Sequence, residues 1–179
     1  QHDHPVLAAL TMSSEILAIE DWVLPTGTVP AVIDKEDFIA RLTAAEQSLD
    51  DPEAPLMTWG YHPYFYGKLT GADLDKISTT RPIIAWLRSC HEFVLNQAAI
   101  EAANLSVDTW NGWSQSAREQ SNFAEGHFWE QGMFALLPFI AEMVFNPEKF
   151  RSGLEVMRDY MHSKGVTFGN EPGGILAKP

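Results

Sequence analysis

The stretch that decides the fold reads Arg81-Pro82-Ile83-Ile84-Ala85-Trp86-Leu87. Its nearly continuous apolar run is typical of a buried β-strand. Other strand-like runs of this kind alternate along the chain with segments whose apolar residues recur at helical spacing. This alternation of strands and helices predicts an α/β (α+β) fold.

The segments on either side of this strand give further expectations. Asp34 resembles a helix N-cap with Asp37 as a weak capping-box partner, and the helix that follows should stop at Asp50-Asp51-Pro52. Further strands are expected at 56–61 and 166–168, and loops at 61–67, which is aromatic, and at 106–125. The other expected helical segments are a helix within residues 5–24 ending near Trp22, a helical turn at 74–77, an Ala-rich helix at 93–103, a helical stripe from Trp129 to Val144 and a helix from Pro147 to Gly165.

Composition limits the kinds of partner. The chain has 179 residues and a formal net charge of −12, and its 12 Lys and Arg are scattered. Clustered cations are needed to bind phosphates or anionic lipid, so we expect neither nucleic acid nor a membrane surface as a partner. No apolar run approaches the roughly 20 residues that span a bilayer. The single cysteine, Cys90, excludes an intrachain disulfide and favours a reducing compartment, the cytoplasm.

The first residues, Gln1-His2-Asp3-His4, suggest a metal site. In an extended strand, His2 and His4 project to the same side and can share one divalent cation. A lone His-x-His pair is a weak signal, and many such pairs are surface accidents or tag remnants. The missing initiator Met leads us to expect a processed product or a piece of a longer protein.

Glu130 and His91 are the other candidates for chemistry. Glu130 stands near the start of a long helix, where the helix dipole alone accounts for an acid. His91 follows the buried strand, and residues just beyond the carboxyl end of a strand often line sites in α/β proteins. A capping or hydrogen-bonding role explains His91 as well. Cys90 is most simply a small buried hydrophobe.

Aromatic residues are numerous, with six tryptophans in the chain. Those at 59–66 and 110–129 offer an aromatic-lined pocket for an apolar ligand. The alternative is that these rings pack into the core, and ring packing is also the simpler explanation for His62 and His127. His162, near the end of a helix, suits a dipole partner.

Several of these segments together resemble one family, the amidohydrolase superfamily, and within it the YtcJ-like metal-dependent hydrolases. The similarity is ordered along nearly the whole chain. It rests on His2 and His4, Leu74-Asp75, Arg81-Pro82 with the strand that follows, His91, Asn96 with its Ala-rich helix, Gly126 with Glu130, and Gly165-Val166-Thr167.

The resemblance implies a part of a (β/α)8 barrel enzyme, because 179 residues are too few to close a barrel of about 250. Residues 1–30 would be an arm with the His-x-His strand end, 31–170 an α/β insertion domain, and 171–179 a tail. The implied metal, zinc by preference, would bind His2, His4 and Glu130, while His91 would face the substrate.

The implied reaction is hydrolysis of a carbon–nitrogen bond in a small amide or cyclic amide. We expect this isolated chain to be inactive, because the later ligands of the barrel are absent, and to self-associate through apolar surface. The alternative function is a stand-alone α/β module that binds an apolar ligand or partner through its aromatic loops.

Overall fold

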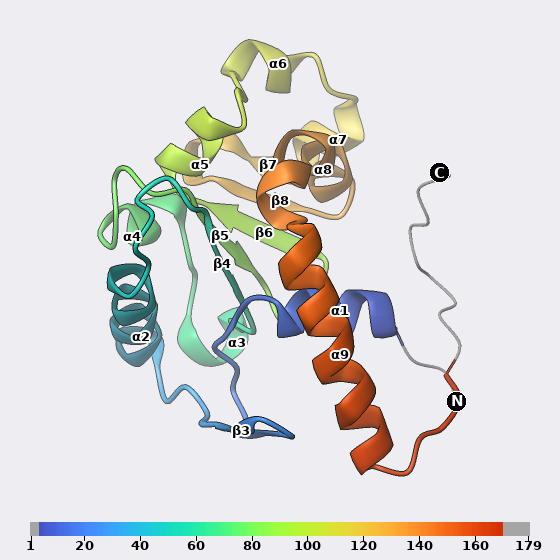
Figure 1. Cartoon of the computed structure of the whole chain (residues 1–179). Helices are drawn as coiled ribbons and strands as arrows, with labels where there is room; N and C mark the ends of the chain where they lie inside the picture. The colour runs from blue at the N-terminus through green and yellow to red at the C-terminus, as the bar shows by residue number, and fades with distance from the viewer. Residues whose placement is uncertain (1–3, 170–179) are drawn as a thin grey trace.

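The computed structural model describes residues 4–169. Its centre is a six-stranded sheet with helices packed against both faces (Figure 1). The strands of this sheet are β1 (Glu15–Ile16), β4 (Leu56–Trp59), β5 (Ile83–Trp86), β6 (Glu92–Leu95), β7 (Ser121–Asn122) and β8 (His127–Trp129). The predicted α/β class is confirmed.

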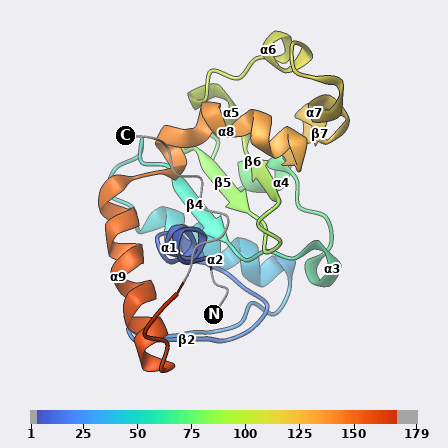
Figure 2. The same ribbon diagram turned by 90° about the vertical axis from the view of Figure 1, so that its right-hand side faces the viewer.

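The other elements connect the strands and cover the sheet. The helices are α1 (Pro5–Met12), α2 (Lys35–Gln47), α3 (Pro63–Tyr66), α4 (Gly71–Asp75), α5 (Gln97–Ala102), α6 (Val107–Asn111), α7 (Gln115–Glu119), α8 (Gln131–Val144) and α9 (Pro147–Ser163), with the 3-10 turn η1 (Phe123–Glu125). A small hairpin joins β2 (Trp22–Leu24) to β3 (Gly27–Val29). The long helix α9 lies beside α1 (Figure 2).

The sheet has a parallel half and an antiparallel half. Its spatial order is β1-β4-β5-β6-β8-β7, in which β4 is parallel to β1 and β5, and the remaining pairs are antiparallel. The strands predicted at 56–61 and around Ile83 are confirmed as β4 and β5, and Trp59 stands opposite Trp86. The two edge strands have two residues each, which leaves little unpaired strand edge.

The central strand β5 is buried on both faces, as its sequence predicts. Ile83 and Ala85 belong to the cluster that contains α2, whereas Ile84 and Trp86 belong to the cluster that contains α8. This alternation is the two-residue repeat of a strand. Each large side chain that is fully buried in this way contributes about 1.5–3 kcal/mol of transfer free energy. The apolar run therefore holds the two helical layers on one sheet.

The helix predicted after Asp34 is confirmed as α2. The Asp34 side chain accepts a hydrogen bond from the backbone N–H of Asp37 at 2.8 Å. The expected capping box is only half formed, because the Asp37 carboxylate accepts from the N–H of Ile33, one residue before the cap. Asn146 caps α9 through the N–H groups of Glu148 and Lys149, so the predicted start at Asn146-Pro147 is also confirmed.

Two local predictions are wrong, one near the N-terminus and one in the middle of the chain. The first helix ends at Met12 rather than near Trp22. Directly after Met12, the hydroxyls of Ser13 and Ser14 donate hydrogen bonds to carbonyls of the last helical turn. Residues 93–95 form β6 rather than a helix, because they pair between β5 and β8. The Ala-rich helix α5 begins only after Asn96.

Residues 106–125 are not a simple loop. Ser106 and Ser114 cap the short helices α6 and α7 by accepting hydrogen bonds from the N–H groups of Thr109 and Ala117. The aromatic loop at 61–67 contains the single turn α3, and the helical turn expected at 74–77 is α4, which begins earlier. Residues 166–168 form no strand.

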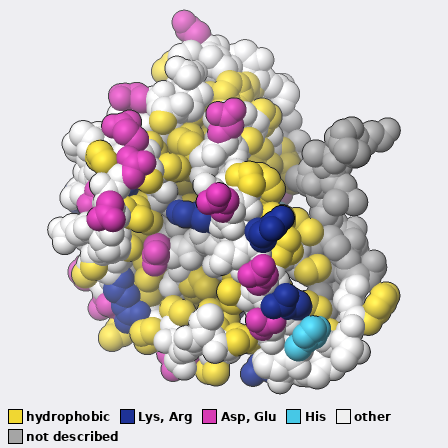
Figure 3. Space-filling view, viewed as in Figure 1, with side chains coloured by type: hydrophobic (Ala, Val, Ile, Leu, Met, Phe, Trp, Pro, Cys, Tyr) yellow, Lys and Arg dark blue, Asp and Glu magenta, His cyan; other side chains and the backbone are white. Residues whose placement is uncertain are grey.

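The surface agrees with the acidic composition. Acidic side chains are spread over the face seen in Figure 3, and the Lys and Arg side chains stand among them rather than in one cluster. Within residues 4–169, no helix is both long and apolar enough to cross a bilayer.

Candidate functional site

His91 lies in the tight loop between β5 and β6. The loop is closed by the N–H of Cys90, which donates to the carbonyl of Leu87 at 2.9 Å, and by the N–H of Leu87, which donates to Glu92 at 3.0 Å. Cys90 has a φ of 62°, in the left-handed region that side chains other than glycine seldom adopt. This loop stands beyond the carboxyl end of β5, where the sequence placed His91.

Glu130 stands between β8 and α8, directly before the helix. Its backbone also has a positive φ, 45°, and its N–H donates to the carbonyl of His91 at 3.0 Å. The Glu130 side chain makes no capping hydrogen bond to α8. That role is taken by Gln120, whose side-chain oxygen accepts from the N–H of Gln131 at 2.8 Å. Capping of the helix therefore does not explain the position of the Glu130 carboxylate.

The side chains of His91 and Glu130 meet. Nδ1 of His91 lies 3.2 Å from one carboxylate oxygen of Glu130 and 3.3 Å from the other. The two side chains are 60% and 49% exposed, so their contact contributes little to stability. They are instead open to a ligand. The structure thus brings together two of the predicted site residues.

A cavity of about 290 Å³ adjoins His91. It is bordered by the sheet, by α8 and by α1, and most of its walls are apolar. Its lining residues are Leu7, Leu10, Trp86, Cys90, His91, Phe93, Met133, Phe134, Leu137 and Val144. Burial raises the pKa of the Cys90 thiol, against weaker opposing effects of Trp59 and Arg88, so this group stays neutral at ordinary pH. Mostly apolar hollows with a few polar groups are the usual form of small-molecule sites.

The His-x-His motif is only partly visible. His2 lies outside the described residues. His4 is exposed and directly precedes α1, whose residues Leu7 and Leu10 line the cavity. Leu7 follows His4 by three residues, which is about one helical turn. Helix α1 therefore connects His4 to the cavity next to His91.

A divalent metal needs more ligands than these residues supply. The imidazole of His91 and the carboxylate of Glu130 are donor types that zinc accepts. Among the residues that the structure describes, however, no group of three or more His, Cys, Asp and Glu side chains could hold a metal ion. Three protein ligands plus water are usual for a catalytic zinc. The described donors alone do not complete such a site.

A second histidine–glutamate pair, which was not predicted from the sequence, lies within β6 and β8, one residue inward from the loop residue His91 on β6. Oε2 of Glu92 is 2.8 Å from Nε2 of His127, and both side chains are largely buried. The hydrogen bond from His127 is the main reason that the pKa of Glu92 is lowered, against the opposite effect of burial. Successive side chains of an extended segment point to opposite sides. From the sequence, His91 and Glu92 could therefore have been expected to have different partners.

The other candidates take structural roles. His127 packs on Trp129, and the ring of His62 packs on Tyr64 and Phe65, as the ring-packing interpretation predicts. His162 lies in the last turn of α9. Trp110 and Trp113 pack against the hydrophobic core rather than around an open pocket, in contact with Phe123, Phe128 and Phe139.

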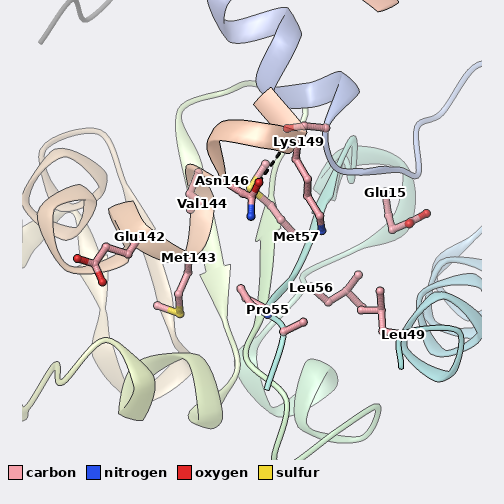
Figure 4. Close-up of a pocket in the computed structure, with 12 residues that line it drawn as sticks. Glu15, Leu49, Pro55, Leu56, Met57, Glu142, Met143, Val144, Asn146 and Lys149 are labelled. Atoms are coloured by element: carbon pink, nitrogen blue, oxygen red, sulfur yellow. Dashed lines mark hydrogen bonds between the residues drawn. The ribbon is translucent and has the colours of Figure 1, made fainter. Parts of the chain in front are cut away.

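Another hollow, of about 190 Å³, lies where α8 passes into α9 (Figure 4). Its lining includes Glu15 and Leu56, the first residues of the parallel strands β1 and β4. Ligands of α/β sheets bind beyond the carboxyl ends of strands, not at their amino ends. Asn146, which points into this region, is engaged in capping α9. The cavity beside His91 is therefore the better candidate.

Two solved structures are similar to this chain. One is an uncharacterized metal-dependent hydrolase from Pyrococcus horikoshii OT3, with a TM-score of 0.60 and 16% sequence identity, covering 94% of this chain and 29% of that chain. The other is an uncharacterized metal-dependent hydrolase from Pyrococcus furiosus, with a TM-score of 0.59 and 18% identity, covering 94% and 30%. At such identities the likeness establishes the fold.

The chain therefore spans less than a third of the length of the two hydrolases. No protein-family model matches the sequence. No curated protein matches it either. The comparisons therefore show that this chain has a mixed α/β fold that also occurs as part of metal-dependent hydrolases.

Proposed function

We propose that this chain is part of a metal-dependent hydrolase, in which His91 and Glu130 form one side of the substrate site. The observation that carries the proposal is the contact between these two side chains at 3.2 Å, next to an apolar cavity. The fold supports the proposal, because the same fold makes up 29–30% of two metal-dependent hydrolases.

The proposed reaction is hydrolysis of a carbon–nitrogen bond in a small amide or cyclic amide. In the complete enzyme, a divalent metal, zinc by preference, would supply an activated water and a polarised carbonyl. His2, His4 and Glu130 are the residues of this chain that we assign to it. The further ligands must come from the rest of the longer protein.

His91 has the chemistry for handling a proton at the leaving nitrogen. An imidazole ring can both accept and donate a proton. The Glu130 carboxylate next to Nδ1 fixes the orientation of the ring, as carboxylates commonly do for functional histidines. Nε2 is then the atom that holds or releases the proton. His91 also stands at the cavity, so the same ring can position the substrate.

The test uses the longer protein that contains this sequence. Its metal content and its hydrolysis of N-acyl amines and cyclic amides should both fall when His2 and His4 are replaced together by Gln. His91→Gln should lower kcat/KM about 10²–10⁴-fold, the usual range for loss of a general acid or base, with the metal retained. His162→Gln, in an exposed turn of α9, is the matched control and should leave kcat/KM unchanged.

The isolated 179 residues should show no appreciable turnover. Metal-dependent amide hydrolysis by this chain alone would contradict the proposal that residues outside these 179 complete the metal site. If the longer protein binds no metal with His2 and His4 in place, the hydrolase assignment fails. The cavity would then favour the alternative function, a stand-alone module that binds an apolar ligand.

A further inference from the structure

We infer that the cavity beside His91 binds a ring-sized, uncharged apolar group carried by a small molecule. This inference rests on the proposed function in one respect: the bound group would be a substituent on the amide substrate, and His91 would face the amide. It deepens that function by naming the class of substrate, an amide with an aromatic or similarly bulky apolar substituent.

The size of the cavity supports a single ring with a small extension. Its volume is about 290 Å³. A protein cavity of about 150 Å³ lined by apolar side chains holds a benzene molecule, so this cavity has room for a benzene ring and a short linker. It is smaller than most sites for drug-sized ligands, which begin at about 300 Å³.

The walls are held in place by the hydrophobic core. Trp86 is 4% exposed, Phe93 is 3% exposed, and their rings stack with centroids 5.9 Å apart. Met133 is 7% exposed and belongs to the same core cluster. A ligand that enters does not have to order these side chains, which reduces the entropic cost of binding. Phe134 is 48% exposed and forms part of the rim.

The polarity of the lining selects an uncharged apolar group. Eight of the ten lining residues are aliphatic, aromatic or methionine side chains, and the other two are Cys90 and His91. Among residues 4–169, no Lys, Arg, Asp or Glu lines the cavity, so a charged substituent would lose its hydration without gaining an opposite charge there. The exposed His91–Glu130 pair offers polar contacts outside the apolar part. The ligand that fits is therefore apolar at one end and polar at the other.

The experiment measures binding to the 179-residue chain without added metal, so that catalysis is not required. Two fluorinated probes are compared by ¹⁹F NMR: N-(4-fluorobenzyl)acetamide, which carries a ring, and N-(2-fluoroethyl)acetamide, which does not. We expect saturable binding of the ring probe and at least about tenfold weaker binding of the other probe, since burying several carbon atoms is worth more than the 1.4 kcal/mol of a tenfold change.

Two variants locate the site. Phe134→Ala removes part of the rim, and Phe145→Ala is the matched control, because both rings are 48% exposed but only Phe134 lines the cavity. Phe134→Ala should weaken binding of the ring probe about fivefold or more, whereas Phe145→Ala should not change it. Leu137→Trp, which fills the cavity, should abolish binding while circular dichroism confirms that the chain is folded.

The outcomes separate this inference from the proposed function. Equal binding of the two probes, or equal effects of the two phenylalanine variants, would overturn the assignment of the cavity to a ring. Failure of the ring probe to bind at all would do the same. Ring binding that persists in a protein without hydrolase activity would support this inference and reject only the hydrolase.

Discussion

Gly153 of α9 lies against the backbone of Ala9 in α1. A Cβ added to Gly153 would come within 2.1 Å of the carbonyl oxygen of Ala9. Both residues are buried, and the two helices lie side by side (Figure 2). Only a glycine permits so close an approach. Because α1 begins directly after His4 and supplies Leu7 and Leu10 to the cavity, this contact also positions the candidate site.

Gly153→Ala should therefore destabilise the fold. Forcing a methyl group into a packed interface costs about 1–3 kcal/mol, and the higher helix propensity of alanine offsets about 1 kcal/mol at most. Urea unfolding followed by circular dichroism measures the change. Ser152→Ala, at the neighbouring exposed position of α9, is the control and should change stability by less than about 0.5 kcal/mol. Equal stability of the two variants would contradict the close contact.

Asn96 provides a second test of the core. Its side chain is fully buried, accepts hydrogen bonds from the N–H groups of Ile83 and Ala99, and donates to the carbonyls of Ser78 and Arg81. Asn96→Ala would leave several of these buried backbone groups unpaired, so we expect a loss of about 2–4 kcal/mol in the free energy of unfolding.

The control for Asn96 is Asn111→Ala, at an exposed position at the end of α6. This change should be close to neutral in the same urea titration. A loss below about 1 kcal/mol for Asn96→Ala would mean that water replaces the missing partners, and the assigned role of Asn96 in joining β5 to α5 would be wrong.

The parts of the fold predicted from sequence are those with a strong local signal. The apolar run of β5, the Asp34 cap and the helix start at Asn146-Pro147 could be predicted because each combines a residue preference with a physical requirement of its element. Strand β6 was misread as helical because it runs directly into an Ala-rich helix. What makes it a strand is pairing with β5 and β8, a tertiary effect that local sequence does not carry.

For the candidate site, sequence reasoning found the residues but not their arrangement. His91 and Glu130 are 39 positions apart in the chain. They meet because β6 and β8 are antiparallel with Glu92 opposite Trp129, so the next residues outward face each other. The cavity was not predicted, since α1, β5 and α8 contribute to it from distant parts of the chain.

The Glu92–His127 pair predicts a loss of stability in acid. The pKa of Glu92 in the folded state is lowered from its ordinary value of 4.5, chiefly by the hydrogen bond from His127. At pH values near and below 4.5 the unfolded chain therefore binds more protons than the folded one, and stability falls as the pH falls through the folded pKa. Above that range the contribution is fully present.

Glu92→Gln should remove this part of the pH dependence. Urea unfolding between pH 3 and pH 6 should show a smaller decline in the free energy of unfolding for the variant than for the parent chain. His127→Gln removes the partner and should reduce the decline in the same way. Declines that remain unchanged in both variants would assign the acid sensitivity to other carboxylates.

The backbone of Glu130 offers a test that separates stability from function. Its φ of 45° and ψ of −114° are values at which glycine is favoured, and a non-glycine residue with positive φ stores about 1 kcal/mol or more of strain. Glu130→Gly should relieve this strain. Because the exposed contact with His91 contributes little, the free energy of unfolding should stay level or rise by about 0.5–1 kcal/mol.

The matched control for Glu130 is Glu142→Gly, at an exposed position inside α8 with ordinary helical geometry. Glycine there should destabilise the chain by about 1 kcal/mol, opposite in sign to the change at Glu130. Under the proposed function, Glu130→Gly should lower hydrolysis by the longer protein, whereas Glu142→Gly should not. Equal losses of stability in the two variants would show that Glu130 is not strained, and full activity of Glu130→Gly would remove its carboxylate from the proposed site.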